Sequence, residues 1–364
     1  MSTRLRRTPL DRRQFLAGVA GATAGVMFGG PDLLRAARRE VVIGGRRVKV
    51  VDGHAHCIVP EAMEVLKDTP LARSISAALA APGTPQVISS DRIRQMDEQG
   101  IDVEVLSINP FWYSAERGLA RELIDVQNER LAAVCAAHPG RLIALASIAL
   151  QHPDLAATEL QDAVRKHGMR GAALGGSING EELSSARFDP FWAAAQELDA
   201  LIFIHPQGFP EIRARVKGNG FLSNVIGNPL ETTVALSHLI FEGTLDRFPR
   251  LRICAAHGGG FLPSYAGRFD HGCLAFPANC TATNRKPASE YLKQLYFDSL
   301  VFTAEGLRHL VAECGASQIV LGTDAPFPWT TTAVDHVLGT PGLSDADRIA
   351  MLGGNLISRL RIAD

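Results

Sequence analysis

The chain has 364 residues, of which 46% are hydrophobic and 21% charged, as expected of a globular protein with a sizeable core. The formal net charge of -1 hides an asymmetry, because residues 1–39 contain eight arginines and two aspartates and the remaining residues are acidic. An acidic main body argues against nucleic acid as a partner. The six cysteines form no C-x-x-C pair, which excludes a zinc knuckle and a thioredoxin motif. Cys273 and Cys280 are close enough to pair in an exported protein, but we interpret both as free thiols.

The N-terminal segment, residues 1–39, has the features of an export signal. Arg12 and Arg13 precede Phe15, and an apolar run rich in alanine and glycine follows. This pattern is typical of the twin-arginine signal, and the run is too short to span a bilayer of ~30 Å as a helix. We therefore expect a periplasmic or exported protein with no stable membrane span. The alternative is a disordered basic arm on a cytoplasmic protein. Residues 40–364 are predicted to form a single domain.

The first predicted strand covers residues 48–56, where valines lead to two histidines. Residues 57–90 contain several prolines and show no clean period outside a short helix at 72–81, which indicates an active-site loop. The pattern after this loop predicts a short helix, a strand and a long amphipathic helix, at residues 91–100, 103–107 and 117–137.

Strands and helices continue to alternate toward the C-terminus. The further strands are predicted at residues 142–147, 171–174, 201–205, 251–255, 295–298 and 319–321. The further helices are predicted at residues 153–167, 189–198, 229–245, 260–273, 303–314, 332–338 and 344–360. About eight short apolar strands alternating with helices predict an α/β fold, a parallel (β/α)8 TIM barrel. A doubly wound open sheet is the alternative, but it would bring ligands from only a few strands to one crevice.

Four of the predicted strands end in residues that can bind a metal. His54 and His56 are spaced i, i+2 and so point the same way, while His205, His257 and Asp324 end later strands. Each alone has an ordinary explanation, such as a core histidine or a helix N-cap. Because the strands of a barrel end at one rim, we expect these side chains to meet in one metal site.

The stretches HAH at residues 54–56, HP at 205–206, HGGG at 257–260 and GTDAPFP at 322–328 resemble the metal-dependent amidohydrolase superfamily. The likeness covers about residues 48–360 and is greatest to the decarboxylase branch typified by aminocarboxymuconate-semialdehyde decarboxylase.

The resemblance implies one divalent metal, usually zinc with manganese as an alternative, bound by His54, His56, His205 and Asp324. It also implies that His257 is a nearby acid/base. Arg268 is implied to bind a substrate carboxylate in the site of a neighbouring subunit, which makes the working unit at least a homodimer. A salt bridge from Arg268 to Asp270 or Asp298 in its own chain is the alternative.

Three imidazoles and one carboxylate would leave a position on zinc for water, whose pKa falls from ~15.7 to ~7. With His257 moving protons, this arrangement predicts non-oxidative decarboxylation of a small unsaturated or aromatic carboxylic acid. The alternative is hydrolysis of a lactone, amide or similar cyclic bond, with His257 or Asp324 protonating the leaving group. Gln207 and Ala325 stand where the resembling enzymes carry Trp and Tyr, which predicts a different substrate from theirs.

Overall fold

The computed structural model describes most of the chain, namely residues 38–80, 86–280 and 286–363. Arg39–Asp364 is one compact unit. The predicted export signal lies outside the described residues except at its last two positions. In the described ranges, no helix has both the length and the apolar character needed to cross a membrane.

Eight parallel strands form the centre of the compact unit. They are β3 (Val51–His56), β4 (Val103–Ser107), β5 (Leu142–Ala144), β6 (Gly171–Leu174), β9 (Leu201–Ile204), β10 (Arg252–Ala255), β11 (Leu295–Asp298) and β12 (Ile319–Val320). Hydrogen-bonded ladders join them in two groups, in the orders β3-β4-β5 and β6-β9-β10-β11-β12. All residues of β3, β4, β6, β9 and β11 are buried, as expected when both faces of a strand are covered.

Two parallel bridges close these groups into a ring. Ala146, just after β5, pairs with Ala172 of β6, and Ala55 of β3 pairs with Ala325 just after β12. The backbone N–H of Ala146 also donates to the carbonyl of Gly171 at 2.8 Å. The predicted TIM barrel is therefore confirmed, and the alternative of an open sheet is wrong.

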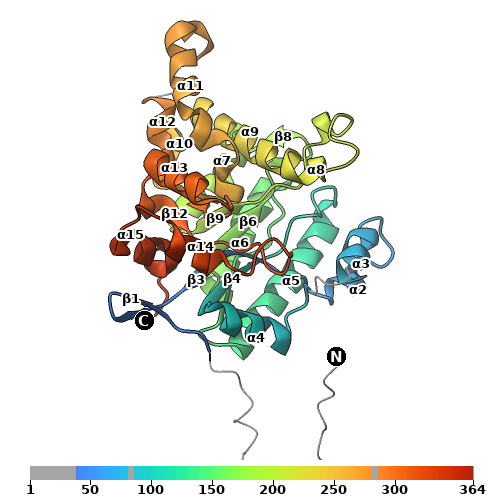
Figure 1. Cartoon of the computed structure of the whole chain (residues 1–364). Helices are drawn as coiled ribbons and strands as arrows, with labels where there is room; N and C mark the ends of the chain where they lie inside the picture. Colours follow the sequence, from blue (N-terminus) through green and yellow to red (C-terminus); the bar gives the residue numbers. More distant parts are fainter. Residues whose placement is uncertain (1–37, 81–85, 281–285, 364) are drawn as a thin grey trace, which may run out of the picture. The chain divides into compact units, whose positions relative to one another are not determined.

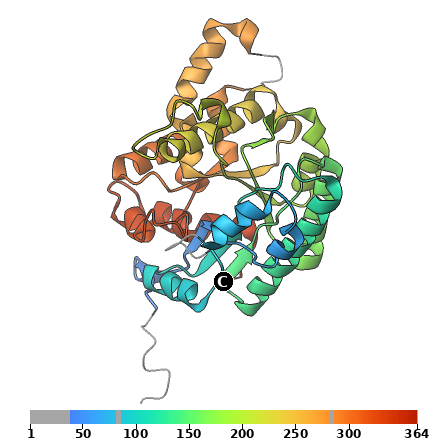
Figure 2. The ribbon, with the colours of Figure 1, turned by 90° about the vertical axis from the view of Figure 1, so that its right-hand side faces the viewer.

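Helices surround the strands in both views of the ribbon (Figures 1 and 2). They are α2 (Ala62–Leu66), α3 (Ala72–Ala80), α4 (Ser90–Gln99), α5 (Arg117–Ala137), α6 (Pro153–His167), α7 (Asp189–Glu197), α8 (Leu222–Val225), α9 (Gly227–Phe241), α10 (Thr244–Arg247), α11 (Leu262–Ala275), α12 (Ala288–Tyr291), α13 (Ala304–Cys314), α14 (Ala333–Gly339), α15 (Asp345–Ile349) and α16 (Asn355–Leu360). One apolar cluster fills the barrel, and a larger one lies between strands and helices.

Three predicted elements differ from the structure. The first barrel strand begins at Val51, because residues 46–48 form β2 (Arg46–Val48), which pairs with β1 (Val41–Ile43) in an antiparallel hairpin. The helix predicted at residues 229–245 is two helices, separated at Gly243 with φ 76°. The last predicted helix is interrupted by a π-helical turn. A Cβ on Gly353 in this turn would lie 2.1 Å from the backbone oxygen of Lys49, which connects β2 to β3.

The interpretation of Cys273 and Cys280 as free thiols is wrong. They form a disulfide with Cα atoms 5.4 Å apart. The reason is that α11 ends at Ala275 and a short turn brings the chain back toward the helix. The C-terminal part of α11 extends beyond the other helices at the top of both views (Figures 1 and 2).

Candidate metal centre

His54 and His56 lie at the carboxyl end of β3, and both are fully buried. Because their side chains share one face of the strand, their Nε2 atoms lie 3.0 Å apart. Asp324 follows β12 and approaches both rings. Its Oδ1 is 3.2 Å from Nε2 of His54 and 3.0 Å from Nε2 of His56. The closed barrel therefore brings three predicted ligands together from its first and last strands.

Buried partners determine which nitrogen of His54 and His56 carries the proton. The Nδ1 of His54 lies 2.6 Å from Oδ2 of Asp298, and a carboxylate there accepts the proton of Nδ1–H. The Nδ1 of His56 is 3.1 Å from Oγ of Ser107, whose hydroxyl donates to the carbonyl of Ala55 at 3.2 Å. Because the hydroxyl proton of Ser107 is used in that bond, Oγ of Ser107 accepts the Nδ1–H of His56. In the neutral form of each ring, Nε2 therefore carries the lone pair.

These positions provide a test of whether the residues fit a metal. The two Nε2 atoms and Oδ1 of Asp324 face one another about 3 Å apart, and with both rings neutral this arrangement is repulsive unless a cation, a proton on His54 or a metal ion, lies among them. Ligands ~2.0–2.1 Å from a tetrahedral zinc ion are themselves separated by about 3.3 Å. Oδ1 of Asp324 is also buried without a hydrogen-bond partner. The residues therefore fit a divalent metal ion.

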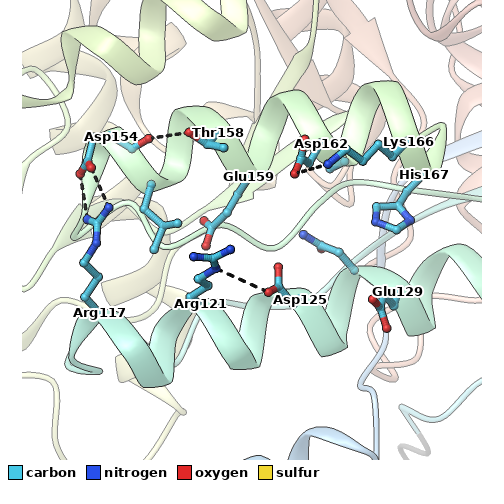
Figure 3. Close-up of a pocket in the computed structure, with 13 residues that line it drawn as sticks. Arg117, Arg121, Asp125, Glu129, Asp154, Thr158, Glu159, Asp162, Lys166 and His167 are labelled. Carbon is cyan, nitrogen blue, oxygen red and sulfur yellow. Dashed lines mark hydrogen bonds and ion pairs between the residues drawn. The ribbon is translucent and has the colours of Figure 1, made fainter.

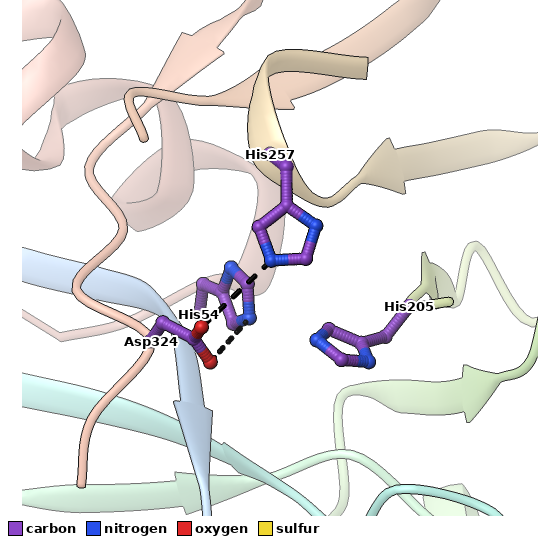
Figure 4. Close-up of side chains that lie close together, drawn as sticks. All are labelled: His54, His205, His257 and Asp324. Carbon is purple, nitrogen blue, oxygen red and sulfur yellow. Dashed lines mark ion pairs between the residues drawn. The ribbon is translucent and has the colours of Figure 1, made fainter. Parts of the chain in front are cut away.

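His205 and His257 complete the cluster (Figure 4). One ligand atom from each of His54, His205, His257 and Asp324 lies within 4.8 Å of the others. The Nδ1 atoms of His205 and His257 are buried and have no hydrogen-bond partner. All five residues predicted from the strand ends therefore meet at one rim.

His257 occupies a different position from the other histidines. Its Nε2 is 3.8 Å from Oδ2 of Asp324, the oxygen that faces away from the 3 Å contacts with His54 and His56. Its side chain is 18% exposed, whereas those of His54 and His56 are fully buried. His257 therefore has access to a molecule in the cavity beside the cluster.

Two of the site residues adopt strained backbone conformations. His257 has φ 56° and Asp324 has φ 59°, in the left-handed region that costs a residue with a Cβ roughly 1–2 kcal/mol. The N–H of His257 donates to Asp298 at 2.8 Å, and the N–H of Asp324 donates to the carbonyl of His54 at 2.9 Å. These hydrogen bonds offset the strain, and the resulting backbone conformation directs both side chains toward the cluster. Glycine is required at position 260, three residues after His257, since a Cβ there would lie 2.1 Å from the carbonyl oxygen of Pro229.

The histidines of the cluster have pKa values shifted in opposite directions. Burial disfavours the charged form of His54, but Asp324 and Asp298 outweigh burial and raise the pKa of His54 to about 10. Burial lowers the pKa of His56 to about 4, and burial together with the neighbouring imidazoles lowers the pKa of His205 well below its ordinary value. His56 and His205 are therefore neutral at pH 7, the form in which histidine binds metals.

A cavity of about 490 Å³ opens beside the cluster. Its polar lining is mostly neutral, and its apolar lining is largely aromatic. The lining residues are Asn109, His205, Pro206, Gln207, Phe221, Asn224, Asn228, His257, Asp324, Phe327, Pro328 and Trp329. The rings of Phe221 and Trp329 are stacked with centroids 6.3 Å apart. Among the described residues, no Arg or Lys lines this cavity or the adjoining one of about 390 Å³, which is also lined by His257 and Asp324.

The family model for amidohydrolases matches residues 51–355. The chain belongs to the amidohydrolase family. The 2-amino-3-carboxymuconate-6-semialdehyde decarboxylase of Dictyostelium discoideum is 32% identical over 272 residues, which are 74% of this chain and 75% of that protein.

Two solved structures extend the comparison. The 5-carboxyvanillate decarboxylase of Sphingomonas paucimobilis shares the fold with a TM-score of 0.78 at 21% identity, over 87% of this chain and all of its own. The dihydroxybenzoic acid decarboxylase of Polaromonas sp. JS666, with bound manganese and 2-nitroresorcinol, is 26% identical with a TM-score of 0.73. It covers 86% of this chain and 97% of its own. The predicted decarboxylase branch and the metal-dependent carboxy-lyase class are confirmed.

Arg268 does not line either cavity beside the metal cluster of this amidohydrolase. It is exposed on α11. In the described part of the chain it has no hydrogen bond or ion pair. Of the acidic partners considered for it, Asp298 pairs with His54, and Asp270 accepts from the N–H of Ser289 at 3.2 Å. In the part of the chain that the structure describes, Arg268 therefore forms neither of the salt bridges, to Asp270 or Asp298, that were considered as the alternative.

Another cavity, of about 530 Å³, lies between α5 and α6 and shares no residue with the metal cluster. Its charged side chains largely pair with one another (Figure 3). Arg117 binds Asp154 at 2.7 Å, and Lys166 binds Asp162 at 2.8 Å. The size of a cavity therefore does not identify the reactive site in this amidohydrolase.

Sequence reasoning did not anticipate Ser107 and the carboxamides Asn109, Asn224 and Asn228. Ser107 ends β4 at the same rim as His56, so its position at a strand end was a usable signal. Asn109 lies on the loop after β4, Asn224 on the short helix α8 and Asn228 in the first turn of α9, and no local pattern marked them.

Proposed function

We propose that the chain is a decarboxylase of a small aromatic carboxylic acid, with one divalent metal held by His54, His56, His205 and Asp324. The observation that carries the proposal is the set of imidazole and carboxylate ligand atoms about 3 Å apart at the end of a cavity with aromatic walls. Nitrogen-rich ligands favour zinc. Manganese is the alternative, because it is bound in the Polaromonas relative.

A divalent ion held by His54, His56, His205 and Asp324 would supply positive charge to bind and polarise the acidic substrate. His257 lines the cavity and is the residue placed to move a proton. Decarboxylation breaks the bond between the ring carbon and the carboxyl carbon, and the electron pair stays on the ring carbon. His257 delivers a proton to that carbon as CO2 leaves. Oδ2 of Asp324, 3.8 Å from Nε2 of His257, stabilises the protonated imidazole.

The lining of the cavity supports an aromatic substrate. Phe327 and the stacked pair Phe221 and Trp329 offer flat apolar surfaces to a ring. Asn224 and Asn228 offer neutral donors and acceptors, which suit hydroxyl or methoxy substituents. A flat, singly charged acid with neutral polar substituents is therefore favoured over an acyclic dicarboxylic acid.

The experiment is a substrate panel with metal-loaded protein. Hydroxylated and methoxylated benzoates are compared with unsaturated aliphatic acids, lactones and amides, and CO2 release is measured against His54→Ala as the control. In deuterium oxide, one deuterium should appear at the carbon that lost CO2. Hydrolysis of a lactone or amide without CO2 release from any acid would overturn the proposal in favour of a hydrolase.

The proposed working unit is a homodimer in which Arg268 acts in the neighbouring subunit. Three facts about the described residues support this arrangement: the Arg268 side chain is exposed and unpaired, Tyr265 beside it is 52% exposed, and none of the residues found to line the two cavities is an Arg or Lys. Arginine suits a carboxylate because its planar fork can bind both oxygens. Exposed aromatic residues beside it suit a protein interface.

Complementation tests the shared site. An Arg268→Ala chain and a His54→Ala chain are each inactive alone. Random mixing should form hybrid dimers with one intact site and recover up to about a quarter of wild-type activity. Absence of recovery in confirmed hybrid dimers, or a monomer at the assay concentration, would rule out the shared site.

A further inference from the structure

Arg92 is a buried arginine that the chemistry described above does not use. It lies on α4, is 5% exposed, and forms an ion pair with Glu104 of β4, which is 2% exposed. Its Nε lies 3.0 and 2.8 Å from the two carboxylate oxygens of Glu104. An ion pair buried this deeply loses much hydration and contributes little net stability by itself. Net stability alone therefore does not account for the pair.

That partner is a backbone carbonyl beside a proposed metal ligand. The Nη2 of Arg92 donates to the carbonyl oxygen of Ala325 at 3.1 Å, and Ala325 directly follows Asp324. The same oxygen accepts the backbone N–H of His56 at 2.6 Å. One carbonyl thus joins Arg92 to the segments that carry His56 and Asp324.

The turn at Asp324 depends on such support. Its φ of 59° is unfavourable for a residue with a Cβ, so the turn relaxes unless its flanking peptides are held. On its amino side, Asp324 donates its N–H to the carbonyl of His54 at 2.9 Å. On its carboxyl side, the Ala325 carbonyl is held by His56 and Arg92. Two side chains contribute to this support, because Oγ1 of Thr323 accepts the N–H of Ala325 at 3.1 Å and Arg92 holds its carbonyl. Arg92 lines neither cavity beside the cluster.

We propose that Arg92 is a positioning residue for the metal site, acting through the Ala325 carbonyl to hold Asp324 in its ligand conformation, while Glu104 orients its guanidinium. The inference rests on the proposed metal ligands but not on the reaction catalysed. Lysine cannot replace this arginine, because an ammonium lacks the planar fork that spans Glu104 and Ala325 at once. Groups that orient metal ligands typically contribute 10–100-fold to metal affinity.

The test compares variants that separate the carbonyl contact from the ion pair. Arg92→Lys keeps a positive charge beside Glu104 but loses the reach to Ala325. Glu104→Gln keeps an acceptor for Nε and leaves Arg92 free to bind Ala325. Arg92→Met with Glu104→Gln removes the contact without leaving a buried charge, so it guards against a variant that fails to fold. Arg94→Ala is the control, because Arg94 lies on the same helix but pairs at the surface with Asp91 and Glu98.

The measurements are the metal dissociation constant, from competition with a chelator, and the visible spectrum of the Co²⁺-loaded protein, which reports ligand geometry. Arg92→Lys and the double variant should bind metal about 10–100-fold more weakly and show an altered spectrum. Glu104→Gln and Arg94→Ala should bind within about threefold of wild type. Wild-type affinity and spectrum in both Arg92 variants, whatever their thermal stability, would overturn the proposal, as would a wild-type protein that binds no divalent metal. A wild-type protein that binds metal but decarboxylates nothing would overturn only the proposed function.

Discussion

Nδ1 of His54 lies 2.6 Å from Oδ2 of Asp298, and both side chains are fully buried. The same carboxylate accepts the backbone N–H groups of His257 and Gly258, each at 2.8 Å. Asp298 therefore orients a proposed metal ligand and the turn that carries the proposed acid/base. Burial opposes its charge, but the hydrogen bond from His54 and the charges of His54 and His257 hold the pKa of Asp298 below its ordinary value.

Asp298→Asn tests this double connection. The amide keeps the size of the side chain but removes the negative charge and one acceptor, so His54 loses its preferred orientation. We expect metal affinity to fall by about 10–100-fold and the turnover rate to fall with it. Chelator competition and steady-state kinetics at saturating metal separate the two effects. Unchanged metal affinity would show that Asp298 supports only the backbone turn.

The metal site itself predicts about one divalent ion per chain by elemental analysis of the purified protein. His54→Ala and His56→Ala should lose both the metal and the activity, because each removes a nitrogen ligand at the 3.0 Å contact. His309→Ala is the matched control, since His309 is exposed and bonds Ser264 at 3.1 Å. Full activity in metal-free protein would contradict the assignment.

His257→Ala separates a ligand from an acid/base. The variant should keep most of its metal, because Nε2 of His257 stands 3.8 Å from Asp324 on the side away from His54 and His56. Its turnover rate should fall by ~10²–10⁴-fold, the usual contribution of a general acid or base. Loss of the metal from this variant would instead make His257 a ligand.

Glu159 predicts a pH dependence of stability that is independent of the metal site. Burial raises the pKa of Glu159 from 4.5 to about 8, and the hydrogen bond from Ala149 N–H only partly opposes this. The folded protein therefore holds this proton more tightly than the unfolded chain. The stability that this bound proton contributes is complete below pH 4.5 and is lost as the pH rises toward 8, at ~1.4 kcal/mol per pKa unit.

Glu159→Gln should remove that loss. At pH 5 the variant and the wild type should have similar free energies of unfolding in urea, and at pH 8.5 the variant should be more stable by a few kcal/mol at most. Glu129→Gln, an exposed carboxylate of the same cavity, should show no such difference. A constant difference between Glu159→Gln and wild type at both pH values would contradict the prediction.

The leader predicts export, and we propose that residues 1–39 direct it through Arg12 and Arg13. Fused to a folded reporter, the leader should carry it across the inner membrane, and replacement of both arginines by lysine should prevent this. The bond between Cys273 and Cys280 gives a second measurement, because such bonds persist in oxidising compartments. Cys273 and Cys280 should be oxidised to a disulfide in the exported protein and reduced in the full-length variant in which lysine replaces Arg12 and Arg13. A reporter that stays in the cytoplasm with either leader would contradict the proposal.

Much of the architecture was predictable from local patterns. Short apolar runs such as those at β4 and β6, alternating with amphipathic helices such as α5, predict a parallel barrel because only buried strands are apolar on both faces. The positions of His54, His56 and Asp324 at strand ends followed from the same patterns, since all strands of a parallel barrel end at one rim.

Only the tertiary structure decided how these residues are supported. Asp298 reaches His54 across 244 positions of the chain, and Arg92 reaches Ala325 across 233. The disulfide also depended on where α11 ends and how the chain returns. Such contacts are set by barrel closure, strand register and the placement of a helix over a strand. Periodicity and motif spacing report only a residue's own neighbours, so they predict which side chains reach the rim but not which buried groups orient them.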